Sequence, residues 1–484
     1  MLNSSLSKTR TYMYYVILLI MFAAGIWFIL AHGSSLNVNR PGASSSTSSV
    51  AAPTASPTVG ASATSANYLS RAWQEGLRSP LSILLLQIVV IIIAARLFAA
   101  VFRKIGQPPV MGEIVAGLVL GPSMLGWFSP PAMALLFPPS SLNTLSLLSQ
   151  IGVVLFMFVV GMELDIQHLR EKASAAIMIS HASIVVPFLL GAALALFIYT
   201  PLAPPETSFA AFALFIGIAM SITAFPVLAR ILEDRGLSKT PLGSTALACA
   251  AIDDVSAWCM LLFVIAIVKS NGLAASIVTI VLVLFFIAFM LFFVKPRLGS
   301  LLERRVENRK HSRGLQAGIL AFVFACAWFT ESLGIHALFG AFLAGVVMPS
   351  APSFRLFLKE KLEAFSSAAL LPLFFAFTGL RTQIKLLNDW SGWLMCLGII
   401  VVAVAGKLGG SMLMARWTRM SWRDSISIGV LMNTRGLIEL VILNIGYDLG
   451  ILSARIFVMM VIMALVTTFM TAPLLSILKV RKEA

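Results

Sequence analysis

The sequence predicts an all-α polytopic membrane protein, with about thirteen core transmembrane helices and one further hydrophobic segment at the N-terminus. Of its 484 residues, 59% are apolar and only 11% are charged, whereas soluble globular chains carry about 25% charged residues. Apolar runs of about 20 residues, the length that crosses a bilayer as a helix, recur along the chain. The basic residues gather in alternate loops between these runs.

The N-terminal region divides into two parts. An apolar run at residues 12–31 follows Lys8 and Arg10, and no small-residue cleavage site comes after it. We therefore expect residues 1–32 to be an uncleaved membrane anchor, while a signal peptide remains an alternative. Residues 33–80 are rich in Ser, Ala, Thr and Pro, a composition that cannot bury a core and predicts a disordered linker. The transmembrane domain is expected to occupy residues 81–480.

The charge distribution between the apolar segments predicts their orientation. The predicted spans are 81–103, 108–128, 142–163, 173–199, 207–233, 241–269, 273–294, 314–332, 335–349, 363–380, 388–415, 421–446 and 453–478. If residue 81 starts outside, the inner loops and tail hold twenty-two Lys and Arg residues, and the outer loops between spans hold four. Lys and Arg favour the cytoplasmic side. We therefore expect a multi-pass protein of the cell (inner) membrane with a cytoplasmic C-terminus.

The same distribution accounts for most of the formal net charge of +15. In a soluble protein that charge would suggest a nucleic-acid partner. Here the basic residues serve as topology signals beside the lipid bilayer, so no nucleic-acid partner is expected.

The two halves of the predicted transmembrane domain resemble each other. GLVLGP (117–122) matches AGVVMP (344–349), and FMFVVGMELDI (156–166) matches FFAFTGLRTQI (374–384). A polar, interrupted segment follows in each half, SITAFPVLAR (221–230) and MNTRGLIEL (432–440). The halves are offset by an odd number of spans, so the second is inverted in the membrane. This pattern predicts an inverted repeat with two crossed discontinuous helices, an architecture of secondary transporters.

Two adjacent acids, Asp253 and Asp254, lie in the middle of a predicted span. Each ionisable group at membrane depth costs at least about 2.5–3.5 kcal/mol, which marks it as a functional candidate. Neighbours on a helix point about 100° apart, so the two carboxylates should have different roles. Carboxylate oxygens bind hard cations as well as protons. Competition between these ions for one site predicts antiport, while a structural polar pair is the alternative.

Lys407 lies deep in another predicted span, about fifteen residues from its outer end. An unpaired buried ammonium is costly, so we expect it to pair with one of the two acids. Snorkelling to a membrane interface is the alternative.

Other polar residues are supporting candidates. Arg435 and Glu439 are four residues apart and share a helix face, either as an ion-facing pair or as a structural pair that holds a broken helix. Pro226 removes one helix hydrogen bond, and we expect Thr223 to face Thr434 where the breaks cross. Glu113, in a further span, completes the set of candidates.

Cofactor chemistry is not indicated. The four cysteines have no CxxC spacing and the five histidines no metal-ligand spacing. Neither G-x-G-x-x-G nor G-x-x-x-x-G-K is present. We therefore expect no bound metal, no cofactor, no ATP and no enzymatic activity.

At these residues the sequence resembles the monovalent cation:proton antiporter-2 family, especially its Kef-type and plant or fungal cation/H⁺ exchanger branch. The resemblance extends from about residue 81 to the C-terminus. It rests on the strings GQPPVMGEIVAGLVLGPSMLG, SITAFPVLARILEDRGL, ALACAAIDDVSAWC, GIHALFGAFLAGVVMP and NTRGLIELVILNIG.

The resemblance implies the sodium/proton antiporter fold, in which a dimerisation domain lies beside a six-helix core, and hence a homodimer. It implies that Asp254 binds the ion and the proton and that Asp253 pairs with Lys407. Possessing both acids and the lysine resembles the electrogenic members, yet some exchangers with both acids are associated with potassium. Many Kef-type systems have a nucleotide-binding domain after the last span, where this sequence has only about six residues.

The leading hypothesis is therefore a secondary active transporter that exchanges a monovalent cation, Na⁺ or K⁺, for protons by alternating access. Two alternatives remain open at this stage. One is a transport-inactive sensor or channel on the same scaffold, and the other is a proton-coupled exporter of an organic cation or metabolite.

Overall fold

The computed structural model describes residues 2–38, 79–163, 173–269, 273–299, 313–334, 336–349 and 351–478. Every regular element in these ranges is helical. Eleven helices are long and apolar enough to cross a bilayer, or twelve if the bent pair Trp422–Met432 and Leu437–Asp448 is one span. The protein is therefore an all-helical, multi-pass membrane protein, as predicted. The expected linker falls mostly outside the described residues.

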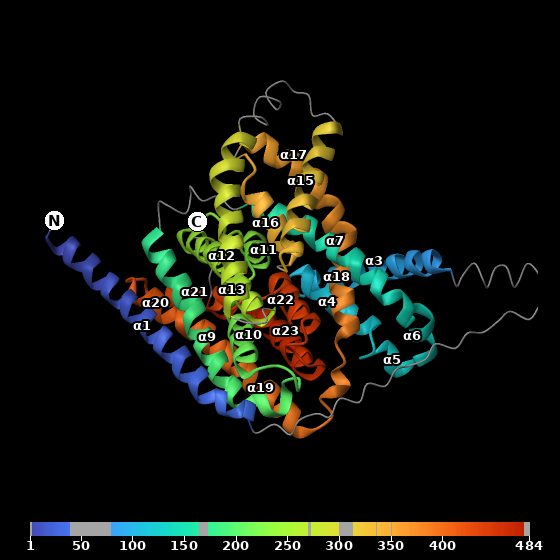
Figure 1. The fold of residues 1–484 in the computed structure, drawn as a ribbon, viewed down its shortest axis with the longest axis horizontal. Coiled ribbons are helices and arrows are strands. Elements are labelled where there is room, and N and C mark those ends of the chain that lie inside the picture. The colour runs from blue at the N-terminus through green and yellow to red at the C-terminus, as the bar shows by residue number, and fades with distance from the viewer. Residues whose placement is uncertain are drawn as a thin grey trace, which may run out of the picture.

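Figure 1 labels the helices of the described ranges. In chain order they are α1 (Leu2–Val38), α3 (Pro80–Lys104), α4 (Pro109–Leu120), α5 (Leu125–Phe128), α6 (Pro130–Leu136), α7 (Pro139–Glu163), α9 (Ala173–Leu202), α10 (Phe209–Ser221), α11 (Phe225–Asp234), α12 (Pro241–Lys269), α13 (Leu273–Ala288), η1 (Phe289–Val294), α15 (Arg313–Ser332), α16 (Ala337–Val346), α17 (Pro352–Phe365), η2 (Ser366–Leu370), α18 (Leu371–Arg381), η3 (Ile384–Leu386), α19 (Trp390–Val404), η4 (Ala405–Gly409), α20 (Gly410–Trp417), α21 (Trp422–Met432), α22 (Leu437–Asp448) and α23 (Ala454–Ile477).

All thirteen predicted segments contain helix, but the helix in one of them is clearly shorter than the prediction. The segment 335–349 holds only the ten residues of α16, which rise about 15 Å, half of a bilayer core. A turn at Gly334, with φ of 79°, precedes α16, and Pro349 follows it. Apolar composition extends past the helix ends here, so it overstates helix length. The segment 363–380 is helical throughout, because α17, the π-helical turn η2 and α18 follow one another without a break.

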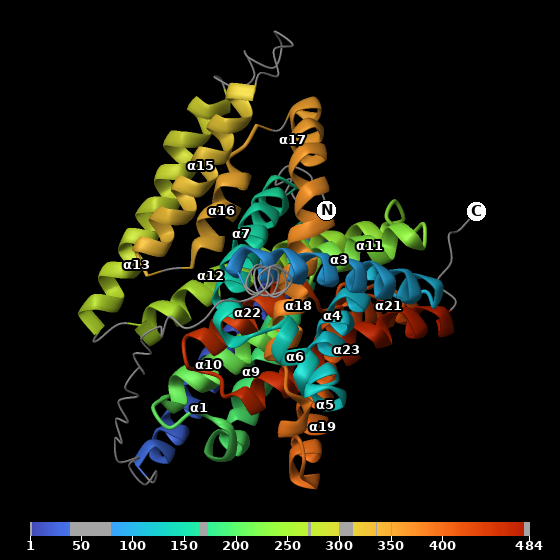
Figure 2. The ribbon, with the colours of Figure 1, turned by 90° about the vertical axis from the view of Figure 1, so that its right-hand side faces the viewer.

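The N-terminal helix α1 packs along α9 at one edge of the bundle (Figure 1). Gly25 lies against Leu189, Gly33 against Phe209, and the Phe22 ring meets Phe188 edge-on at 5.3 Å. Helices α13 and α15 run side by side (Figure 2), and the ring centroids of Phe286 and Phe329 lie 4.8 Å apart.

The internal repeat is visible in how four helices pack. Helix α4 packs against α18, and α7 packs against α16. A Cβ atom on Gly379 would lie 2.2 Å from the carbonyl carbon of Gly117, and one on Gly345 would lie 2.9 Å from that of Gly161. The glycine of the first motif in each half thus contacts the glycine of the second motif in the other half. Two halves related by a pseudo-two-fold axis produce this exchange.

Two discontinuous helices cross at the centre of the fold. Residues 222–224 interrupt α10 and α11, and residues 433–436 interrupt α21 and α22, which are bent by 42°. The Ala224 N–H donates to the Thr434 carbonyl oxygen at 3.0 Å, so the breaks meet. Pro226 lies in the first turn of α11, where its missing N–H leaves no helix bond unmade. Side chains from α9, α12 and η4 converge on this crossing.

Candidate functional site

Helix α12 brings both acids to the crossing. Asp253 and Asp254 are buried, with 0% and 1% of their surface exposed. Because adjacent helical residues point about 100° apart, the two carboxylates face different neighbours. Trp258 follows Asp254 by four residues and so shares its helix face. The Trp258 ring stacks on Phe342 of α16 at 6.3 Å, so this face of α12 is turned towards α16.

The Asp253 carboxylate is saturated with hydrogen bonds. Its Oδ1 accepts from Ser180 Oγ at 2.5 Å. Its Oδ2 accepts from Ser183 Oγ at 2.9 Å, Thr223 Oγ1 at 2.7 Å and Lys407 Nζ at 2.8 Å. Four donors, one of them the Lys407 ammonium group, hold this carboxylate in one position. This arrangement suits a structural anchor better than an exchangeable ion site.

Lys407 uses all three of its donors in the core. Besides Asp253, its ammonium group donates to the Ser183 carbonyl oxygen at 2.9 Å and the Ser221 carbonyl oxygen at 2.5 Å. The residue lies in the π-helical turn η4, a local irregularity that is frequent at functional sites. Its side chain is fully buried, so the structure pairs Lys407 with Asp253 and leaves no path to an interface for snorkelling.

Asp254 contrasts with its neighbour. Both of its carboxylate oxygens are buried, and neither accepts a hydrogen bond of normal geometry from any described residue. Asp254 is therefore a buried acid whose ligand positions are unfilled.

The Arg435 guanidinium group binds carbonyl oxygens at the C-terminal end of α10. Its Nη1 donates to the Ala219 carbonyl oxygen at 2.8 Å and its Nη2 to that of Met220 at 2.7 Å, at the end of α10. Nη1 also contacts Glu439 Oε1 at 3.1 Å. Cations are favourable at helix C-termini, and Glu439 lies in the first turn of α22, where an anion is favourable. The geometry favours a pair that holds the broken helices.

The other sequence candidates fall in different places. Thr223 donates to Asp253 and to the Met432 carbonyl oxygen, at 3.2 Å. The Thr434 hydroxyl instead donates to Thr471 Oγ1 at 3.3 Å, so the two threonine side chains do not bond to each other. Glu113 is buried in α4, and its carboxyl group interacts electrostatically with the Arg96 guanidinium group. No hydrogen bond or ion pair in the described ranges joins it to the acid pair.

Sequence reasoning missed several residues of the site. Ser180 and Ser183 supply two of the bonds to Asp253. They are three residues apart in an apolar span, and that spacing on one helix face was a usable signal. Asn433 lies in the interrupted segment MNTRGLIEL, and both its side-chain polar atoms are buried without a partner among the described residues.

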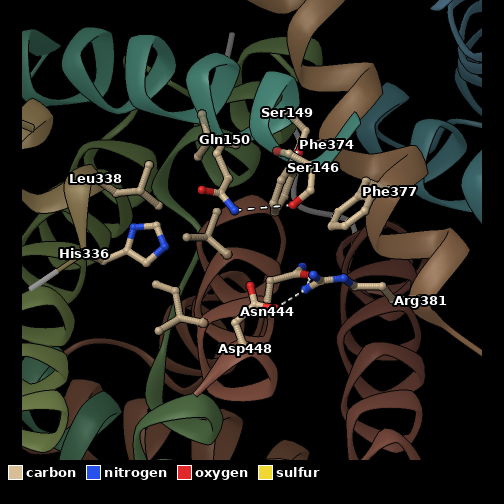
Figure 3. A pocket seen from close by; sticks show the side chains of 13 residues that line it. Ser146, Ser149, Gln150, His336, Leu338, Phe374, Phe377, Arg381, Asn444 and Asp448 are labelled. Carbon is tan, nitrogen blue, oxygen red and sulfur yellow. Dashed lines mark hydrogen bonds and ion pairs between the residues drawn. The ribbon is translucent and has the colours of Figure 1, made fainter. Parts of the chain in front are cut away.

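A polar cavity of about 350 Å³ lies between α7, α15, α16, α18 and α22, at the end of the bundle that the predicted topology places outside. Figure 3 shows an adjoining pocket that shares Ser146, Gln150, His336, Arg381 and Asp448 with it. Arg381 of α18 pairs with Asp448 of α22 at 2.7 Å and donates to Asn444 Oδ1 at 3.1 Å. These bonds join α18 to α22 at the wall of the cavity.

Crossed broken helices from an inverted repeat, with buried acids beside them, define a secondary-transporter scaffold. Residues 89–478 match the family described as sodium/hydrogen exchanger, transmembrane. The chain belongs to this family.

Two kinds of comparison agree. The chain is 44% identical over 395 residues to the Na(+)/H(+) antiporter NhaS4 of Synechocystis, covering 81% of this chain and 96% of that protein. It is 39% identical to Cation/H(+) antiporter 17 of Arabidopsis thaliana (83% and 49% covered) and 35% identical to K(+)/H(+) antiporter 1 of Saccharomyces cerevisiae (82% and 46% covered). The chain thus spans about half the length of these two relatives. The sodium proton antiporter MjNhaP1 of Methanocaldococcus jannaschii shares the fold, with a TM-score of 0.60 at 15% identity and coverage of 82% and 97%.

Proposed function

We propose that the protein is a secondary active antiporter that exchanges a monovalent cation, Na⁺ or K⁺, for protons, with Asp254 as the shared site. The observation that carries this proposal is the contrast between the two acids. The side chains of Ser180, Ser183, Thr223 and Lys407 all donate to Asp253, and the oxygens of Asp254 accept no hydrogen bond from the described residues. A proton or a cation satisfies such a carboxylate, and both cannot do so together.

Alternating access couples cation transport to proton transport in the opposite direction. Whichever ion binds Asp254 removes the cost of its buried charge, so the loaded carrier moves between membrane faces more easily than the empty one. The polar cavity beside α22 would serve as the outer aqueous route, and the chain would lie in the cell membrane with its C-terminus in the cytoplasm. We also propose a homodimer and the division into residues 1–32, 33–80 and 81–480. The Na⁺/H⁺ and K⁺/H⁺ relatives keep both cations as candidate substrates.

Everted vesicles that carry a pH-sensitive dye test this proposal. In the wild type, adding Na⁺ or K⁺ should collapse an imposed proton gradient. Asp254→Asn should abolish the response, because an amide neither titrates nor carries a charge. Asp234→Asn is the matched control, since that acid is half exposed at the end of α11. A wild-type response from Asp254→Asn would refute the assignment, and runs with Li⁺, Na⁺, K⁺ and Rb⁺ would establish the preferred ion.

A further inference from the structure

The side chain of Asn433 is buried at the break between α21 and α22, as the C-terminal cap of α21. Only 1% of the residue is exposed, and neither Oδ1 nor Nδ2 has a hydrogen-bond partner within the described structure. A buried amide without partners is costly. It therefore needs a ligand or an ordered water molecule.

The residues before and after Asn433 in the chain both hydrogen-bond to the break between α10 and α11. The Met432 carbonyl oxygen accepts the Thr223 hydroxyl, and the Thr434 carbonyl oxygen accepts the Ala224 N–H. The Thr223 hydroxyl also bonds to Asp253 Oδ2, at 2.7 Å. Consecutive Cα atoms are about 3.8 Å apart, and Asn433 and Asp254 each directly follow a residue that contacts Thr223.

Most of the polar groups named at the crossing are occupied. Thr223 is bonded to Asp253, the Arg435 N–H to Thr468 Oγ1 at 3.0 Å, and the Thr434 hydroxyl to Thr471. Lys407 and Arg435 direct their charges at carbonyl oxygens and at other acids. Trp258 Nε1 and Arg435 Nε have no partner among the described residues, but they are donors and cannot bind a cation, and Glu439 Oε2 belongs to the ion pair with Arg435. The Asp254 carboxylate and the Asn433 amide also lack partners there, and both offer oxygen atoms, one anionic and one neutral.

We propose that the amide oxygen of Asn433 is a neutral ligand to the cation held by Asp254, and that it sets the preference among monovalent cations. This inference rests on the proposed antiport function and adds a specificity-determining residue to it. A cation that leaves water needs several oxygen ligands, and one carboxylate supplies at most two. A proton on Asp254 needs no such ligand. Asn433 therefore acts on the cation step and leaves the proton step unchanged.

The test is vesicle transport by the full chain, with the cation concentration and the pH varied separately. Asn433→Ala should raise the KM for Na⁺ and K⁺ by about tenfold, because a ground-state ligand is lost, and should change the ratio of the two KM values. The dependence of the rate on proton concentration should stay that of the wild type. Asn433→Gln keeps the amide and should recover part of the preference. Asn388→Ala, an exposed residue between η3 and α19, is the matched control.

A second measurement covers variants that transport poorly. The detergent-solubilised protein should melt at a higher temperature when NaCl or KCl replaces choline chloride, since a ligand that binds only the folded state stabilises it. The shift should vanish in Asp254→Asn and shrink in Asn433→Ala. KM values within twofold of the wild type, or a parallel loss of cation and proton dependence, would overturn the role of Asn433. Continued transport by Asp254→Asn would overturn the antiport site itself.

Discussion

Lys407 Nζ lies 2.8 Å from Asp253 Oδ2 at a place where neither side chain reaches solvent. The pair links the π-helical turn η4 to α12, and Ser183 of α9 bonds to both partners. It therefore fixes η4, α12 and α9 around the crossing. Asp254, the next residue, takes no part in this pair.

Lys407→Met should be strongly destabilising. It leaves the Asp253 carboxylate buried without its counter-charge, and breaking such a pair costs about 3–5 kcal/mol. Thermal melting in detergent measures the effect. The double variant Asp253→Asn with Lys407→Met removes both charges and should melt above the single variant. A single variant as stable as the wild type would contradict the role given to the pair.

Arg435→Gln should also destabilise the protein, because it exposes the carbonyl oxygens of Ala219 and Met220 to an apolar interior and leaves Glu439 alone. The loss should again be about 3–5 kcal/mol. Arg435→Lys should recover little, because a single ammonium cannot reproduce the guanidinium fork. The exposed Arg230→Gln is the control and should melt like the wild type. Full recovery by lysine would mean that charge alone matters.

The Arg381–Asp448 pair should contribute little to stability. Its side chains are 21% and 41% exposed, and such pairs are worth about 0–1 kcal/mol and weaken with salt. Asn444→Ala should cost more, because this buried amide bonds to Thr378 Oγ1 and the Leu440 carbonyl oxygen, both at 2.9 Å. The melting temperatures of Asp448→Asn and Asn444→Ala at low and high salt distinguish the contribution of the ion pair from that of the Asn444 hydrogen bonds. If the ion pair were the main link between α18 and α22, Asp448→Asn would destabilise the protein more than Asn444→Ala.

Gly345→Ala should disrupt the contact between α7 and α16, since its Cβ would lie 2.2 Å from the Phe158 carbonyl oxygen. Overpacking of this kind costs about 1–3 kcal/mol. Gly318→Ala is the matched control, because nothing lies within 4 Å of its added Cβ. There the loss of glycine from a helix should stabilise by about 0.5–1 kcal/mol. Equal melting temperatures for the two variants would refute the close packing of the repeat.

The sequence alone predicted the helical membrane fold, the inverted repeat and the segments that break. Each of these leaves a local mark, such as an apolar run, a glycine or a proline. It also predicted that Lys407 needs an acid, because a buried ammonium requires a partner. Apolar composition does not locate helix ends, and for this reason α16 proved shorter than the predicted span.

Only the tertiary structure assigned the partners. Adjacent acids look equivalent in a sequence, but donors from α9, η4 and the break between α10 and α11 fill the oxygens of Asp253, while Asp254 faces away from those donors. Likewise, Arg435 could be placed near Glu439 from spacing, but its bonds to the end of α10 join residues 215 or more positions apart. The chain determines which charged groups enter the membrane, and long-range packing decides which of them remain unsatisfied.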